Sequence, residues 1–83
     1  MSKLMGTKGT SRTDVYFVTY DEDTARRLVD VLMRNYDVIK YVRSRVVKEL
    51  YYISIRGRVD KIRDYLSSND KISWYKVDFI EFR

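Results

Sequence analysis

Residues 14–36 read DVYFVTYDEDTARRLVDVLMRNY, and the hydrophobic period changes within this stretch. Residues 14–20 are almost all β-branched or aromatic, which is typical of a strand buried on most sides. After the acidic run at 21–23, apolar side chains recur at the spacing of one helix face, which predicts an amphipathic helix over about Glu22–Tyr36. This stretch therefore predicts one strand followed by one helix.

The remaining chain continues the alternation. Strand patterns occupy Val38–Val47, Leu50–Arg56 and Ile72–Phe82, and a second helical pattern occupies Val59–Ser67. Lys48-Glu49 is the expected hairpin turn, but it lacks Gly or Asn, so a longer or bulged loop is the alternative. The order β-α-β-β-α-β in so few residues predicts an α+β fold, the ferredoxin-like plait. Such a plait is a four-stranded antiparallel sheet in the order 4-1-3-2, with both helices on one face and the other face open.

Length and composition predict a single domain over residues 14–83, preceded by a flexible basic N-terminal arm over residues 1–13. The arm mixes Gly, Ser, Thr and scattered bases without apolar periodicity. In the domain, the 45% hydrophobic content supplies an adequate core. The chain has no Cys, so it has no disulfide and no Cys-based metal site. It also lacks His, the commonest general base and metal ligand, so we expect a non-catalytic protein without cofactor or metal.

Hydropathy predicts a cytoplasmic protein that does not act in a membrane. No apolar run approaches the roughly 20 residues that a membrane-spanning helix needs, and residues 1–13 lack the apolar stretch of a secretory signal. The chain has no Gln, no Pro and one Ala, and 35% of its residues are charged. A charge-rich composition with few thermolabile residues is typical of proteins from thermophiles.

Positive charge is concentrated in the predicted middle hairpin. The whole chain carries a formal net charge of +5, whereas residues 40–63 alone carry +6. Such polarity bears on the choice of partner and says little about fold.

Alternation along the strands divides the side chains between two faces of the sheet. We expect the helices to cover Val15, Phe17, Val42, Val46, Tyr51, Ile53, Ile55, Tyr75, Val77 and Phe79. The open face would then carry Tyr16, Val18, Tyr20, Tyr41, Arg43, Arg45, Leu50, Tyr52, Ser54, Arg56, Trp74, Lys76, Asp78 and Ile80. Arginines beneath helices would be costly, which favours this assignment, and a register error of one residue would exchange the two sets.

The expected open face combines aromatic and basic side chains, a combination suited to nucleic acid. Bases stack on aromatic rings at about 1–3 kcal/mol each, and basic side chains hold the phosphates. We therefore predict a binding site for single-stranded or structured nucleic acid, RNA or DNA, formed by Tyr16, Tyr41, Arg43, Arg45, Lys48, Tyr52, Arg56, Arg58, Trp74 and Lys76.

Two of these strands resemble, in part, those of the RNA-recognition motif, a four-stranded sheet with stacking aromatics. The first-strand signature of that family is matched by residues 15–18, with Tyr16 at the stacking position. The third-strand signature is matched at Lys48, Tyr52 and Ile53, whereas Glu49 and Tyr51 replace the family's glycines. The resemblance implies that bases stack on Tyr16 and Tyr52.

An alternative is that the same face makes a homodimer or binds a protein partner. Large exposed apolar faces mark protein interfaces, and oligomerisation supports small cores. A ligand-sensing module of the amino-acid-binding plait type is a third option, disfavoured because no Gly follows the first strand.

Two shorter motifs each have two interpretations. Asp21-Glu22-Asp23 is either a Mg²⁺ site, as in the CRISPR-associated integration nucleases that Tyr20-Asp21 and Arg26-Arg27 resemble, or a helix N-cap, which we favour. Arg56-Gly57-Arg58 is either a phosphate-binding turn or a Gly that ends a strand, and we favour the latter.

Overall fold

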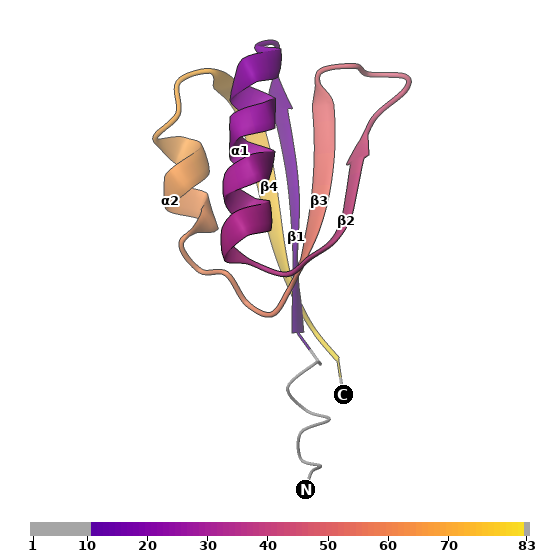
Figure 1. Cartoon of the computed structure of the whole chain (residues 1–83), viewed down its shortest axis with the longest axis vertical. Helices are drawn as coiled ribbons and strands as arrows, with labels where there is room; N and C mark the ends of the chain where they lie inside the picture. The colour runs from indigo at the N-terminus through magenta and orange to yellow at the C-terminus, as the bar shows by residue number, and fades with distance from the viewer. Residues whose placement is uncertain (1–10, 83) are drawn as a thin grey trace, which may run out of the picture.

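A computed structural model describes residues 11–82 of the chain. Its elements follow the expected order: β1 (Ser11–Thr19), α1 (Glu22–Asn35), β2 (Val38–Arg43), β3 (Leu50–Arg56), α2 (Ile62–Ser67) and β4 (Ile72–Glu81). The strands form one antiparallel sheet in the order β2-β3-β1-β4, so that β1 and β3 are central, as expected. Both helices lie on the same side of this sheet (Figure 1). The architecture is an open α+β sandwich compatible with the ferredoxin-like plait.

Three predicted boundaries differ from the structure by three or four residues, whereas the others agree within one residue. Strand β1 begins at Ser11, so residues 11–13 belong to the sheet and not to the predicted arm, and Thr13 is fully buried. Strand β2 ends at Arg43 instead of Val47, because residues 44–49 form a loop closed by hydrogen bonds between Ser44 and Leu50 and between Leu50 and Val47. Helix α2 begins at Ile62, not Val59. Residues 1–10 of the predicted arm lie outside the described residues.

The core lies between the sheet and the helices. Alternate residues of β1 and β3 meet the apolar stripe of α1, and α2 packs beside β4; the buried set is Val15, Phe17, Ala25, Leu28, Val29, Leu32, Tyr51, Ile53, Ile55, Val59, Ile62, Leu66 and Val77. Tyr75 and Phe79, also predicted to be covered, are partly buried at the margin of this core. The parity assignment for β1, β3 and β4 is therefore confirmed.

The assignment for β2 is wrong, and a one-residue bulge is the reason. Val38 pairs with Ile55, but Lys40 pairs with Ser54, so that Ile39 is an extra residue in the ladder. Beyond this bulge every side chain of β2 lies on the face opposite to the one that simple alternation predicts. Val42 therefore lies on the open face and is 42% exposed, and Val46 lies in the following loop, 92% exposed.

A buried hydroxyl fixes the connection from β3 to α2. Thr13 Oγ1 accepts a hydrogen bond from the Val59 amide at 3.0 Å and donates one to the Gly57 carbonyl at 2.7 Å. Gly57 ends β3 with φ of 87°, a left-handed conformation that favours glycine. The favoured interpretation of Arg56-Gly57-Arg58, a glycine that ends a strand, is thus confirmed.

We predict that Thr13→Val lowers the free energy of unfolding by about 1–3 kcal/mol, because the substitution leaves the Val59 amide and the Gly57 carbonyl without their partner. Urea denaturation followed by circular dichroism measures this loss. Thr13→Ser keeps the hydroxyl and serves as the control. Equal destabilisation by the two variants would show that the hydroxyl is not what matters.

Candidate functional site

The open face of the sheet is built from rows of side chains that lie side by side across the strands. Residues that pair directly across antiparallel strands share a face. The pairing register therefore gives a central row of Val42, Tyr52, Tyr16 and Lys76, a row above it of Leu50, Val18 and Trp74, and two rows below it of Lys40, Ser54, Asp14 and Asp78 and of Arg56, Arg12 and Ile80. Tyr16, Tyr52, Trp74, Lys76 and Arg56 thus share this face, as the sequence predicted.

Three aromatic side chains, Tyr16, Tyr52 and Trp74, form what we call the aromatic platform. The ring centroids of Tyr16 and Tyr52 are 4.9 Å apart with a 32° angle between the planes. Trp74 is 49% exposed, and Lys76 Nζ lies 5.9 Å from the centroid of the Tyr16 ring. Burial, followed by the neighbouring Tyr52, raises the pKa of Tyr16 above 10.0. The Tyr16 ring is therefore uncharged at neutral pH.

A hollow adjoins the platform on the β2 side. It has a volume of about 280 Å³ and is lined mainly by Tyr16, Lys40, Val42, Leu50 and Tyr52. Aromatic, aliphatic and ammonium groups thus surround one depression on the open face. Lys40 was not among the predicted site residues, because without the bulge it would lie beneath the helices.

Asp14 lies on the open face inside β1 and is only 4% exposed. Ser54 Oγ donates to Asp14 Oδ1 at 2.9 Å, and Arg12 Nη2 donates to Asp14 Oδ2 at 3.1 Å. Arg12 Nε also lies 3.0 Å from Oδ1, but without hydrogen-bond geometry. Asp14 therefore lies within β1 and not at the end of the strand. Its parity with Tyr16 was the signal that placed it on this face.

Tyr41 and Arg43 do not belong to the open face. The bulge at Ile39 turns both toward the helix layer, where Arg43 Nη2 lies 3.0 Å from Glu22 Oε2 of α1. The guanidinium also lies 5.2 Å from the centroid of the Tyr51 ring, and its Nε donates to the Lys48 carbonyl at 2.6 Å. A charge pair at the rim removes the cost that sequence reasoning assigned to an arginine on this side.

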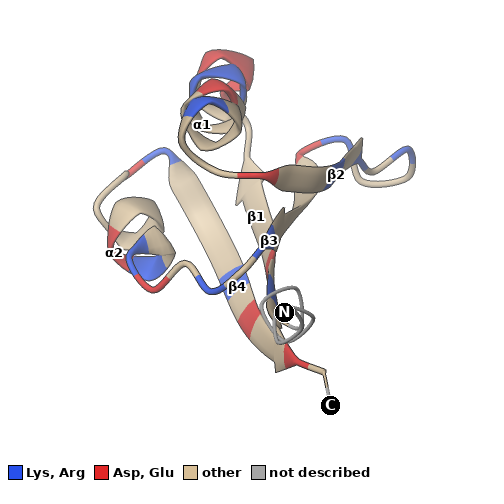
Figure 2. Ribbon diagram, turned by 60° about the horizontal axis from the view of Figure 1, so that its bottom comes forward, with Lys and Arg blue, Asp and Glu red and all other residues tan. Residues whose placement is uncertain are grey.

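Arg45 and Lys48 lie in the loop between β2 and β3, where Figure 2 shows several basic segments together. Ser44 Oγ accepts hydrogen bonds from the amides of Val46 and Val47, which fixes the first half of the loop. A hollow of about 490 Å³ is lined by Glu22, Arg43, Ser44, Arg45 and Lys48. The loop thus presents two basic side chains beyond the end of the sheet, where they are accessible to an anionic ligand.

Two other predicted bases have partners within the protein. Arg56 lies on the open face, but its Nε lies 2.7 Å from Asp37 Oδ2. Arg58 lies toward the helix layer, where its guanidinium sits 4.2 Å from the centroid of the Phe79 ring and its Nε lies 2.7 Å from Asp60 Oδ1. Arg58 is therefore separate from the aromatic platform.

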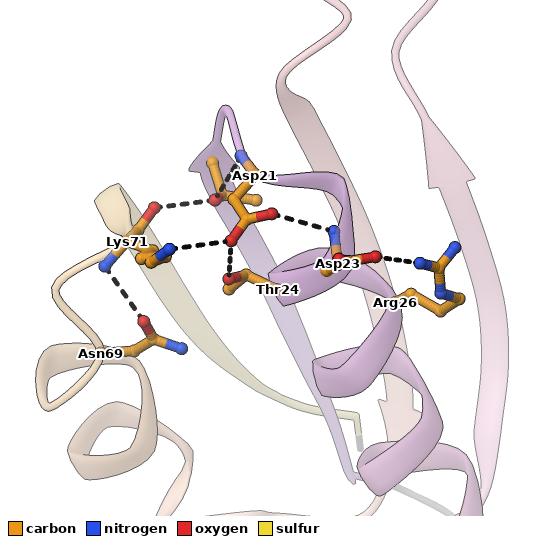
Figure 3. Close-up of polar contacts among 7 residues, drawn as sticks. Asp21, Asp23, Thr24, Arg26, Asn69 and Lys71 are labelled. Atoms are coloured by element: carbon orange, nitrogen blue, oxygen red, sulfur yellow. Dashed lines mark hydrogen bonds and ion pairs between the residues drawn. The ribbon is translucent and has the colours of Figure 1, made fainter.

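The acidic run after β1 caps a helix, as favoured from the sequence. Asp21 is the N-cap of α1: its carboxylate accepts from the Asp23 amide at 3.2 Å and from Thr24 Oγ1 at 2.9 Å, and Lys71 Nζ lies 3.3 Å away (Figure 3). Asp23 pairs with Arg26 one turn along the helix. Within residues 11–82, no three acidic side chains are grouped as a metal site requires. Helix α1 thus accounts for this cluster.

The capping network predicts a specific pH dependence of stability. The hydrogen bond from Thr24, followed by the contact with Lys71, lowers the pKa of Asp21 below 3.8. The stabilisation from its ionised form is thus complete above pH 3.8 and is lost as the pH falls through the folded-state pKa. We expect Asp21→Asn, which still caps, to melt below the wild type at pH 7, with the gap closing under pH 3.8.

Thermal denaturation at a series of pH values between about 2 and about 7 measures the difference in melting temperature between the variant and the wild type. Asp30→Asn, on the exposed side of α1, removes the same charge away from the cap and serves as the control. A gap between Asp21→Asn and the wild type that stays constant over the acid range would contradict the predicted role of the Asp21 carboxylate.

Comparisons with protein-family models, curated proteins and solved structures gave no match to this chain. Within residues 11–82, no helix is long and apolar enough to cross a membrane.

Proposed function

We propose that the chain is a non-catalytic nucleic-acid-binding protein of the ferredoxin-like plait class, and that its open sheet face binds single strands. Bases stack on Tyr16, Tyr52 and Trp74. Lys40, Arg45 and Lys48 contact phosphates, and Lys76 contacts the nucleotide that stacks on Tyr16. Tyr41, Arg43 and Arg58, which belonged to the sequence-based set, are left out because they lie toward the helix layer.

The aromatic platform is the observation that carries this proposal. Three rings from β3, β1 and β4 lie on the face of the sheet opposite to α1 and α2, and accessible rings accept bases of any sequence by stacking. Two ammonium groups flank the platform, Lys40 toward β2 and Lys76 on β4. The adjacency of Tyr16 and Tyr52 also agrees with what the resemblance to the RNA-recognition motif implies.

Ion pairs within the face decide which basic side chains are available to phosphates. Arg12 is paired with Asp14, Arg56 is paired with Asp37, and Lys76 Nζ lies 3.6 Å from Asp78 Oδ2. By contrast, Lys40, Arg45 and Lys48 have no ion-pair partner among residues 11–82 and are exposed or half-exposed near the β2 edge. The phosphate backbone of the nucleic acid would therefore follow this edge, and its nucleobases would lie across the platform.

Trp74, the chain's one tryptophan, provides the direct test. Single-stranded oligonucleotides should quench its fluorescence at low salt, and the affinity should fall steeply as salt rises. Tyr52→Ala should weaken binding by about 1–3 kcal/mol, and Lys40→Glu with Lys76→Glu should weaken it further and flatten the salt dependence.

Lys61→Glu, in the helix layer, is the matched control and should bind like the wild type. If neither RNA nor DNA single strands alter the Trp74 emission or the anisotropy of a labelled oligonucleotide at low salt, the proposed function is wrong.

A second candidate function is supported by the apolar end of the same face. Val18, Val42 and Leu50 adjoin the platform, and large contiguous apolar patches on a small protein favour burial against another chain. In this alternative, two copies pack open face to open face and form a homodimer.

We predict that, if this dimer forms, Val42→Glu converts it to a monomer, because the substitution places a charge within the buried interface. Val42 is already 42% exposed in one copy, so the variant should retain the wild-type thermal stability at low concentration. Sedimentation velocity over a range of concentrations measures the change. A wild-type protein that is monomeric at every concentration excludes the dimer.

A further inference from the structure

Asp78 is an acidic side chain beside the aromatic platform. A surface that bound only phosphates would not carry a carboxylate at this position. It lies on β4, two residues from Lys76 and directly across from Asp14. Its side chain is 42% exposed. A carboxylate here repels phosphates, so that it lowers the affinity of the face for a backbone unless it contacts another part of the ligand.

The two carboxylates of this row differ in what their oxygens bind. Asp14 is buried and receives hydrogen bonds from Ser54 and Arg12, so it is part of the folded protein's internal network. Asp78 has no hydrogen-bond partner within residues 11–82; its one close polar contact is Lys76 Nζ, 3.6 Å from Oδ2. Only the Asp78 carboxylate therefore remains available to a ligand.

The register places this carboxylate at the edge of a stacked base. Lys76 pairs across from Tyr16, and Asp78 is the diagonal neighbour of Tyr16 along β4. Diagonal cross-strand neighbours are about 7–8 Å apart, which is within reach of long side chains and of a base that stacks on the ring. The Lys76–Asp78 pair is thus placed where it can contact the edge of a base stacked on Tyr16.

This pair offers a donor and an acceptor side by side. The Lys76 ammonium only donates hydrogen bonds, and the Asp78 carboxylate only accepts them. The Watson–Crick edge of guanine presents the complementary order, an O6 acceptor followed by the N1–H and N2–H donors. No other common base has two adjacent donors, which a carboxylate receives with both of its oxygens.

We propose that Lys76 and Asp78 read the Watson–Crick edge of a guanine stacked on Tyr16, so that the target is a guanine-containing single strand. This inference rests on the proposed function. Guanine O6 accepts from Lys76, and Asp78 accepts from N1–H and N2–H. Single-stranded targets suit this contact, because their unstacked bases leave the Watson–Crick edge free.

The test uses the full chain and seven-residue oligouridines, of roughly the length one sheet covers, with a central G, A, C, U or inosine. Anisotropy should show that the G oligonucleotide binds about tenfold or more tightly than the A, C and U oligonucleotides, and that the inosine oligonucleotide, which lacks N2–H, has an intermediate affinity. The corresponding DNA series shows whether the sugar matters. Asp78→Asn should remove the preference for G while retaining affinity for the all-U strand.

Asp30→Asn, an equal change of charge on α1, should leave the preference for G intact. Binding of every oligonucleotide without a preference for G, or a preference that persists in Asp78→Asn, would overturn the guanine assignment and leave the proposed function standing. Failure of all oligonucleotides to bind would instead remove the proposed function itself. The two failures are therefore distinguishable.

Discussion

The structure depends on the alternation of side chains along the central strand β1. Thr13, Val15, Phe17 and Thr19 point into the helix layer and are essentially excluded from solvent, whereas Tyr16 and Val18 lie on the open face. Because β1 pairs with both β3 and β4, its parity fixes the faces of two further strands. The buried core and the aromatic platform are the two sides of this one constraint.

Polar contacts at the ends of β1 attach the rest of the chain to it. Thr13 holds the connection from β3 to α2, and at the other end Thr19 Oγ1 donates to the Lys71 carbonyl at 2.7 Å and accepts from the Asp21 amide. These hydroxyls satisfy loop backbone groups that a small domain has few other means to cover. Helix positions thus follow from β1, and both helices lie on the face opposite to the aromatic platform.

Charge on the surface is divided between internal pairs and unpaired bases, and this division changes the functional picture. By charge alone, four arginines on this surface could bind phosphates. Each of them instead pairs with a carboxylate of the protein: Arg12, Arg43, Arg56 and Arg58. The proposed interface therefore relies on lysines and loop residues around an aromatic centre. Its selectivity, in our proposal, comes from Asp78, which has no hydrogen-bond partner within residues 11–82 and forms an ion pair with Lys76 of the same site.

The sequence by itself determined the element order, the central position of β1 and β3, the core of three strands and a helix N-cap within residues 21–23, because hydrophobic period and cap chemistry are local properties. Only the tertiary structure decided the face of β2. One extra residue at Ile39 inverted Tyr41, Val42 and Arg43, and nothing local marks such a bulge, since its cause is the pairing with β3. The sequence likewise showed how many basic side chains the hairpin carries. Which of them form ion pairs depends on acidic side chains such as Glu22 and Asp37, which folding brings close to the hairpin.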